Sequence, residues 1–348
     1  MASTTPKPLT VLVIGVGQMG SSHLLAYHQS PHFHVVGVLT RNVPELPVEL
    51  KEYKSLHFID LESALALKPD IVAINTHTDS HAHYAMAAME AGAHVFVEKP
   101  LASTLAEAQR VVDAAKRVHK KLVVGYILRH HPSWAEFIKQ ARLLGPPYVI
   151  RISLNQKSRG KLWDIHQRVL KDNSPIVDSG VHYVDVMLQI TKSRPVQVRG
   201  MGVRLAHDLG QDEVNYGHLQ ITFADGSVGW YEASLGPMIS KIGCTIRDVM
   251  GPKGSVSMIQ DDQPGSAAME KVTRSASIRV ASVDGGEKDL SMLNEPSFAE
   301  LCARQQAFLL NAIRGDWDLS QHMDDAVQSL AVAIAAETSR KENNAVDL

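Results

Sequence analysis

The chain has 348 residues, more than one hydrophobic core usually accommodates, so two domains are the first expectation. With 45% hydrophobic and 21% charged residues and a formal net charge of −2, it has no charge excess that would favour a polyanion or a membrane surface. No apolar run approaches the roughly 20 residues that span a bilayer, and residues 1–8 lack the basic-then-apolar pattern of a signal peptide. Cys244 and Cys302 lie far apart in the sequence, which is typical of a reducing compartment. We therefore expect a soluble cytoplasmic protein.

The seventeen histidines raise the question of a metal site. His77, His81 and His83 follow one another closely, and His130 is next to His131. A zinc site needs three or four converging nitrogen, sulfur or oxygen ligands, and paired histidines alone do not supply them. We expect no metal.

The first expected strand, Thr10–Ile14, runs directly into a GxGxxG motif at the start of a helix that begins near Met19. Between a strand and a helix, the three glycines permit a tight turn, the approach of a pyrophosphate and close packing of the helix on the strand. The helix N-terminus then offers unpaired N–H groups to the phosphates. A glycine turn that binds nothing is the alternative. The expected cofactor-binding residues here are Gly15, Gly17, Gln18, Met19 and Gly20.

The end of the second expected strand, His34–Leu39, should carry the residue that meets the adenosine ribose. A site that selects NAD normally has an acid about 20 residues beyond the glycines. Here the strand is followed by Thr40, Arg41 and Asn42, with no acid before Glu45. Because arginine offers a planar fork of donors to phosphate oxygens, Thr40 and Arg41 favour NADP over NAD as the cofactor.

Strands and helices continue to alternate up to Tyr126. This order predicts a parallel sheet with crossover helices on both faces, a Rossmann dinucleotide-binding domain over residues 1–126. The expected elements are a strand at Ile71–Asn75, a helix at Ser80–Ala91 capped by Thr78 or Asp79, a strand at His94–Val97, a helix from the Thr104–Glu107 capping box to about His119, and a strand at Leu122–Val124.

The buried strand at His94–Val97 ends abruptly in Glu98, Lys99 and Pro100. A lysine at the carboxyl end of a central parallel strand lies where ligands bind in open α/β sheets. The proline restricts Lys99 to extended geometry and so fixes the direction in which its side chain leaves the strand. A solvated strand end that the proline merely terminates is an equally open interpretation of this segment alone.

Residues 127–348 have a different pattern, which predicts an α+β domain with a large, mostly antiparallel open sheet. One sheet face should pack on helices, while the other is expected to be apolar and uncovered, as at an oligomer interface, unless the late helices cover both. The expected elements are a connecting segment at Arg129–Pro132, a helix at Trp134–Leu143, strands at Tyr148–Leu154, Val196–Leu205, Asn215–Phe223, Val228–Ser234, Cys244–Met250, Ser255–Ile259 and Ser277–Val283, and helices at Phe298–Arg314 and Asp324–Arg340.

A single helix, expected from Ser174 to about Ile190, interrupts the strands of this domain. Asp178 and His182 are four residues apart and share a face, which Asp185 joins. A carboxylate one turn from an imidazole can orient the ring and raise its basicity, as a general base requires. An Asp/His pair that only stabilises the start of the helix is the alternative.

In combination, the glycine motif, Glu98-Lys99-Pro100 and the segment from Asp178 to Asp185 resemble the Gfo/Idh/MocA family, the glucose-fructose oxidoreductase and inositol dehydrogenase group. The likeness extends over nearly the whole chain. It implies an NAD(P)-dependent oxidoreductase that acts on a secondary alcohol or ketone of a sugar, inositol or related polyol. It also implies that residues 127–348 are the substrate-binding and oligomerisation domain, with a homodimer or homotetramer formed through the C-terminal sheet. The small net charge gives no reason to expect a nucleic-acid or membrane partner.

The resemblance assigns the catalytic residues to Lys99, His182 and Asp178. We expect His182 to be the base, Lys99 to position the hydroxyl and Asp178 to bind substrate or orient His182, although Lys99 and His182 could exchange roles if burial lowers the pKa of Lys99. Glu98 and Lys99 are expected beside the nicotinamide ribose, with a Lys99–Pro100 bond that could be cis. Thr76 and His81 complete the expected cofactor-binding set, although Thr76-His77-Thr78 departs from the Thr-Pro-Asn sequence common in the family.

The other expected substrate contacts are Arg129, Trp163 and His166; loop packing is the alternative for the last two. Other dehydrogenase classes fit less well, because no tyrosine has a lysine four residues later and the cysteines of a zinc alcohol dehydrogenase are missing. A non-catalytic dinucleotide-binding sensor of the same fold, or a reductase acting on a non-sugar substrate, remains open.

Overall fold

The computed structural model describes residues 7–43, 45–240, 245–259, 275–293 and 295–348, and the chain forms two compact units. The first unit comprises residues 1–127 and 296–327, and the second comprises residues 128–295 and 328–348. The division expected at 126/127 supposed two consecutive segments. In the structure, the segment 296–327 returns to the first unit, because the buried face of helix α10 (Phe298–Arg314) packs against α1 (Gln18–Gln29).

The first unit is a parallel sheet of six strands in the order β3-β2-β1-β4-β5-β6. The strand order reverses between β1 and β4, the switch point at which nucleotides bind in Rossmann sheets. The predicted fold class is therefore confirmed. The elements are β1 Leu9–Ile14, β2 Phe33–Leu39, a 3₁₀ helix Val48–Leu56, β3 His57–Phe58, α2 Leu61–Leu65, β4 Ile71–Ile74, α3 Thr78–Glu90, β5 His94–Val97, α4 Leu105–Arg117 and β6 Leu122–Val124.

Apolar strands buried on both faces hold this sheet in place. Val11, Val13, Ile71 and Phe96 belong to one core cluster, which also takes in Leu309 from α10. Runs of buried β-branched and aromatic residues are what a parallel sheet covered on both faces requires. The sheet core therefore positions the carboxyl ends of the parallel strands β1, β4 and β5 rigidly at one edge.

The capping box at the start of α4 is formed as expected. The Thr104 side chain accepts from the Glu107 backbone N–H, and the Glu107 side chain accepts from the Thr104 backbone N–H. The expected cap of α3 is wrong. Its N-cap is His77, which is extended and makes no side-chain capping bond, so Thr78 and Asp79 lie inside the first turn. The hydroxyl of Ser80 contacts the His77 carbonyl oxygen at 2.8 Å and so joins this turn to the loop before it.

The second unit is built on a sheet whose nine described strands have the order β14-β13-β12-β11-β7-β10-β9-β8-β15. Strands β7 and β10 are parallel and the other described pairs are antiparallel, in agreement with the expected mostly antiparallel sheet. The strands are β7 Val149–Lys157, β8 Pro195–Val203, β9 Tyr216–Phe223, β10 Val228–Gly236, β11 Arg247–Gly251, β12 Gly254–Ile259, β13 Ser277–Ser282, β14 Glu287–Ser291 and β15 Val346–Asp347.

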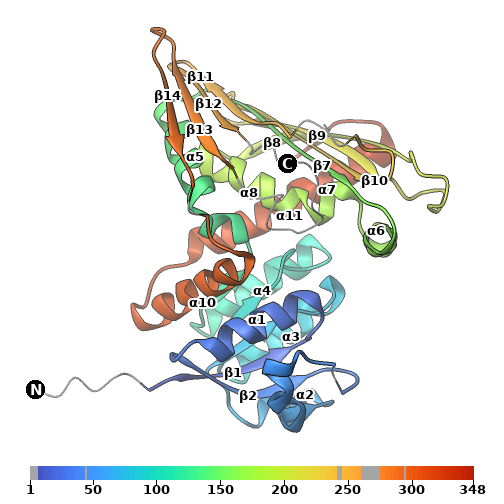
Figure 1. The fold of residues 1–348 in the computed structure, drawn as a ribbon, viewed down its shortest axis with the longest axis vertical. Coiled ribbons are helices and arrows are strands. Elements are labelled where there is room, and N and C mark those ends of the chain that lie inside the picture. Colours follow the sequence, from blue (N-terminus) through green and yellow to red (C-terminus); the bar gives the residue numbers. More distant parts are fainter. Residues whose placement is uncertain (1–6, 44, 241–244, 260–274, 294) are drawn as a thin grey trace, which may run out of the picture. The chain divides into compact units, whose positions relative to one another are not determined.

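Helices α5, α7 and α8 pack on one face of this sheet (Figure 1). The expected single helix over residues 174–190 is wrong, because the chain forms two helices separated at Ser179 and a further helix, α6, before them. Of the expected strand at Cys244–Met250, residue 244 lies outside the described residues. The helices are α5 Pro132–Leu143, α6 Lys161–Asp172, α7 Pro175–Asp178 and α8 Gly180–Thr191, and α11 Ser320–Glu342 continues from the first unit into the second.

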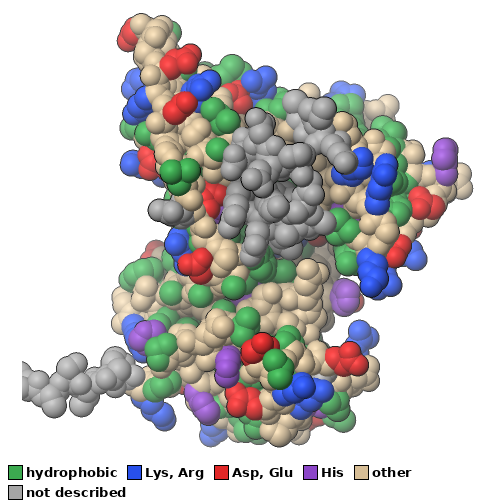
Figure 2. All heavy atoms as spheres, in the orientation of Figure 1, with side chains coloured by type: hydrophobic (Ala, Val, Ile, Leu, Met, Phe, Trp, Pro, Cys, Tyr) green, Lys and Arg blue, Asp and Glu red, His purple; other side chains and the backbone are tan. Residues whose placement is uncertain are grey.

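The opposite face of the sheet is mixed rather than uniformly apolar. One cross-strand row contains Gln220, Trp230, Arg151 and Asp248, and the Arg151 guanidinium pairs with the Asp248 carboxylate at 2.6 Å. The adjacent row carries the exposed apolar side chains of Val149, Val228 and Met250. Charged groups of both signs are also interspersed on the surface that Figure 2 presents. Among the described residues, no helix is long and apolar enough to cross a membrane.

Candidate active site

The glycine turn between β1 and α1 leaves open space at one of its three glycines. A Cβ atom on Gly20 would lie 2.0 Å from the Gly15 carbonyl oxygen, and one on Gly15 would lie 2.8 Å from the Asn75 carbonyl oxygen. Gly15 also has a φ of +81°, which favours glycine. A Cβ atom on Gly17, by contrast, would meet no atom within 4 Å. Gly15 and Gly20 are therefore required by the turn itself, while Gly17 leaves room for a ligand.

Helix α1 begins at Gln18 and has Gly17 as its N-cap, with no side-chain capping bond and no acid in its first turn. The first N–H groups of a helix lack intrahelical partners and attract anions. Gln18 and Met19 occupy this first turn, so the structure brings the five predicted residues of the glycine motif together. The open side of Gly17 and the uncapped helix start fit the pyrophosphate of a dinucleotide.

Thr40 and Arg41 lie at the carboxyl end of β2, next to this turn. The Gly15 amide donates to the Leu39 carbonyl oxygen at 2.9 Å, and Leu39 pairs with Ile14 in the sheet. The Thr40 hydroxyl donates to the Asn42 carbonyl oxygen, while Arg41 is exposed. This strand end therefore offers a cation close to the phosphate turn and no carboxylate at positions 40–43.

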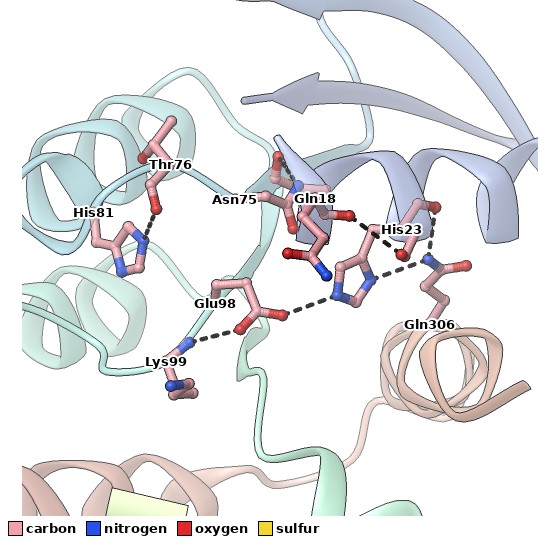
Figure 3. A network of polar contacts seen from close by, with 10 residues as sticks. Gln18, His23, Asn75, Thr76, His81, Glu98, Lys99 and Gln306 are labelled. Carbon is pink, nitrogen blue, oxygen red and sulfur yellow. Dashed lines mark hydrogen bonds and ion pairs between the residues drawn. The ribbon is translucent and has the colours of Figure 1, made fainter. Parts of the chain in front are cut away.

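The carboxyl end of β5 carries a chain of buried polar groups (Figure 3). The Glu98 side chain bonds through Oε1 to Nε2 of His23 at 2.9 Å, and through Oε2 it accepts from the Lys99 backbone N–H at 3.1 Å. Gln306 of α10 donates to the His23 carbonyl oxygen at 3.0 Å and approaches Nδ1 of His23 at 3.4 Å. If Gln306 donates to Nδ1, the opposite nitrogen carries the proton that His23 gives to Glu98. The Lys99–Pro100 bond is cis.

The carboxyl end of β4, the strand next to β5, faces these buried polar groups. Asn75 is buried, and its backbone N–H donates to the Ile14 carbonyl oxygen at 2.8 Å. The Thr76 carbonyl oxygen lies 3.1 Å from Nε2 of His81, whose Nδ1 lies 2.8 Å from the Pro100 carbonyl oxygen. His81 is only 1% exposed, so the structure places it behind the loops rather than on an open surface.

His23 and Gln306 were missed by the sequence analysis. The one local signal for His23 is its place three residues after Gly20, on the buried side of α1. Its partner Gln306 is 283 residues away, and such a pairing leaves no pattern in a single sequence.

In the second unit, Asp178 ends α7 and His182 lies in the first turn of α8, both half-buried. The His182 amide donates to the Ser179 carbonyl oxygen at 3.1 Å, so the chain stays helical across the break. Burial lowers the pKa of the half-buried His166 on α6, and the charge of Asp178 partly opposes this shift. His166 and Asp178 are thus electrostatic neighbours, which the sequence did not indicate.

Asp185 was expected on the same helix face as Asp178 and His182, but its carboxylate is already engaged by other side chains. Asp185 is fully buried, and its carboxylate is paired with the Arg129 guanidinium, with an Nε–Oδ2 distance of 2.9 Å, and bonded to Gln189. A buried carboxylate needs such a partner, so this ion pair accounts for Arg129 without a substrate.

Trp163 is 7% exposed, and its indole N–H donates to Asp208 Oδ2 at 2.8 Å. Its ring belongs to a small apolar cluster beneath α6. These contacts support the packing interpretation of Trp163. The other cluster members are Leu170, Ala206, Leu209 and Leu235.

Among the described residues, no three His, Cys, Asp or Glu side chains gather in a way that could hold a metal ion. The three neighbouring histidines diverge, since His81 is buried in α3, His83 is exposed and His77 precedes the helix. Cys302 is buried as a free thiol, and burial raises its pKa to about 12.

The fold and the glycine turn define a dinucleotide-binding Rossmann protein with a second α/β domain. The chain belongs to the Gfo/Idh/MocA family: residues 9–126 match its "Oxidoreductase family, NAD-binding Rossmann fold" and residues 138–348 match its "C-terminal alpha/beta domain". The resemblance found in the sequence motifs is thereby confirmed.

Curated relatives with similar sequences carry dehydrogenase names. UDP-N-acetylglucosamine 3-dehydrogenase of Acidithiobacillus ferrooxidans is 31% identical over 196 residues, 56% of this chain and 58% of that protein. D-glucoside 3-dehydrogenase of Escherichia coli is 26% identical over 195 residues, 54% of this chain and 56% of that protein. The alignments therefore span just over half the length of these relatives.

Solved structures match over nearly the full chain. UDP-N-acetylglucosamine 3-dehydrogenase from Acidithiobacillus ferrooxidans superimposes with a TM-score of 0.78 at 22% identity, covering 97% of this chain and 99% of the other. Scyllo-inositol dehydrogenase from Lactobacillus casei, solved with NAD(H) and scyllo-inositol, gives a TM-score of 0.77 at 18% identity, with 98% and 99% covered. At these identities the likeness concerns the fold alone.

Proposed function

We propose that this chain is an NAD(P)-dependent dehydrogenase that moves a hydride between nicotinamide and a secondary alcohol or ketone of a sugar, inositol or related polyol. The observation that carries the proposal is the edge formed by β1, β4 and β5, where a glycine turn open at Gly17 stands beside a lysine on a fixed backbone. The relatives named as sugar and inositol dehydrogenases support the substrate class. A non-catalytic sensor could lose the reactive groups, whereas this chain retains both Lys99 and His182.

The residues of the first unit would hold the cofactor. Gly15, Gly17 and Gly20 shape the turn, and the amides of Gln18 and Met19 at the start of α1 would meet the pyrophosphate. Thr76 and Glu98 belong to the loops expected to flank the nicotinamide end. When bound, the nicotinamide supplies the hydride chemistry, and the protein supplies binding, orientation and electrostatics.

The proton chemistry is assigned to three side chains. His182 accepts the proton of the substrate hydroxyl, because a hydride can leave the carbinol carbon only as that proton departs. Lys99 positions the hydroxyl and stabilises developing negative charge on its oxygen. Asp178 binds substrate or orients His182, and its neighbour His166 is the additional substrate-contact candidate.

A panel of sugars and inositols, assayed for reduction of NAD⁺ and NADP⁺, tests the proposal. We expect at least one secondary alcohol of the panel to support turnover. If no compound of the panel supports turnover while the protein still binds nucleotide, the non-catalytic sensor would be favoured instead. The same assay compares the cofactors, and a kcat/KM ratio that favours NAD⁺ by about tenfold or more would contradict the expected NADP preference.

Replacement of Arg41 by alanine is expected to weaken NADP⁺ binding by about tenfold while NAD⁺ binding hardly changes. The reason is that a guanidinium interacts more strongly with a 2′-phosphate than with a hydroxyl. Kd values for both nucleotides, measured by fluorescence titration, check this. Arg117→Ala is the control, because Arg117 is an exposed arginine of α4 that pairs with Glu90 at 3.4 Å. An equal loss for both nucleotides would contradict the assignment of Arg41.

We further propose that the chain forms a homodimer or homotetramer through the mixed face of the sheet in the second unit. That face exposes Val149, Val228 and Met250 beside the Arg151–Asp248 ion pair, a combination of apolar and polar groups usual at interfaces. Size-exclusion chromatography with light scattering is expected to give twice or four times the chain mass. Val228→Glu should shift the protein towards the monomer, and a monomeric wild type would refute the proposal.

A further inference from the structure

His81 is a buried histidine whose two ring nitrogens face carbonyl oxygens of two different loops. Its Nδ1 lies 2.8 Å from the Pro100 carbonyl oxygen, and its Nε2 lies 3.1 Å from the Thr76 carbonyl oxygen. Figure 3 shows the ring between the Thr76 loop and the segment that carries Lys99. His81 therefore connects the ends of two neighbouring strands, β4 and β5.

Both partners of the His81 ring can only accept. A neutral imidazole donates from one nitrogen, whereas an imidazolium donates from both. Burial lowers the pKa of His81, with Glu98 opposing this shift and Lys99 adding to it. Near neutral pH the ring is therefore neutral and gives its single proton to one carbonyl. The shorter contact indicates that this acceptor is the Pro100 carbonyl oxygen.

The Pro100 carbonyl belongs to the residue that follows Lys99, and the Glu98 carboxylate accepts from the Lys99 N–H at 3.1 Å on the other side. The backbone at Lys99 is thus held at both ends by buried side chains. Displacement of a catalytic group by about 1 Å can cost about 100-fold in rate, so such support matters for a lysine that acts on a substrate.

We propose that His81 is a positioning residue: its hydrogen bond to the Pro100 carbonyl oxygen holds the loop after β5 to α3, the helix that follows the loop after β4, and thereby sets the backbone at Lys99. Its importance for turnover rests on the proposed function. The role differs from the expected direct contact with the cofactor, because His81 is enclosed and acts through the Pro100 carbonyl oxygen.

Four variants test this role. His81→Ala removes both contacts. His81→Asn keeps a side-chain N–H near the position of Nδ1, and His81→Gln keeps one near the position of Nε2. His83→Ala is the matched control, because His83 is an exposed histidine two residues along the same helix. Melting temperatures identify any variant that is not folded.

The first measurement is amide hydrogen exchange of residues 76–80 and 99–103 without nucleotide. We expect His81→Ala to accelerate exchange in both segments by roughly fivefold or more, since local opening loses the support of a hydrogen bond. His83→Ala should leave both unchanged. Because no nucleotide or substrate is present, this measurement tests the positioning role of His81 even if the proposed dehydrogenase activity is never found. Unchanged exchange in His81→Ala would overturn the proposal.

The second measurement is steady-state kinetics with a substrate from the panel. We expect kcat to fall about tenfold or more in His81→Ala, with a smaller change in KM, and to recover largely in His81→Asn but not in His81→Gln. A kcat equal to that of His83→Ala, or equal losses in all three folded His81 variants, would overturn the positioning role. Failure of the wild type to turn over any substrate would contradict the proposed function instead.

Discussion

Replacement of Lys99 by alanine is expected to lower kcat about 100-fold or more while nucleotide binding persists. Positioned groups that assist proton transfer or stabilise a developing charge typically contribute factors of this size. The surrounding fold should tolerate the change, because the strand before Lys99 is held by the buried residues of β5 and by the Glu98–His23 contact. The measurement is kcat and KM with a substrate from the panel, together with the nucleotide Kd.

The control for this experiment is Lys120→Ala. Lys120 lies just before β6, at the amino ends of the parallel strands, whereas Lys99 follows the carboxyl end of β5. We expect this variant to retain wild-type kinetics. If Lys99→Ala keeps more than a tenth of the wild-type turnover, Lys99 is not the catalytic group.

Local motifs explain why most elements of the first unit could be predicted, although the 3₁₀ helix Val48–Leu56 and the short elements β3 and α2 were not expected. Buried strands rich in valine and isoleucine, the glycine turn and the Thr104–Glu107 capping box each depend on residues within about one turn of each other. The return of α10 to this unit could not be predicted in the same way. Its amphipathic pattern shows that one face is buried but does not identify the partner, which is α1.

In the second unit the local signals were weaker. Strand β14 has the sequence Glu-Lys-Asp-Leu-Ser and lies at the edge of the sheet, so its pairing with β13 has no apolar alternation to indicate it. Helix α6 follows its N-cap Gly160, whose φ of +54° favours glycine, and the sequence alone did not identify this residue as the start of a helix.

The candidate site divides along the same lines. The glycine motif, Glu98 and Lys99 are recognisable in the sequence because each directly follows a buried strand, β1 or β5. His23 and Gln306 were not, since they act through contacts with Glu98 and with each other across long sequence separations. Arg129 and Asp185 were each noted as candidates, but their mutual ion pair is a fact of three-dimensional packing.

Two alanine substitutions in the glycine turn should separate ligand binding from folding. Gly17→Ala places a methyl group where no protein atom lies within 4 Å, so we expect an unchanged melting temperature and nucleotide binding weakened about tenfold or more. Gly20→Ala places one 2.0 Å from a backbone oxygen, and we expect a loss of roughly 2 kcal/mol or more in the free energy of unfolding. Gly286→Ala, at another open glycine, should change neither. Because the space at Gly17 is the basis for the phosphate site, wild-type nucleotide affinity in a folded Gly17→Ala protein would remove that basis.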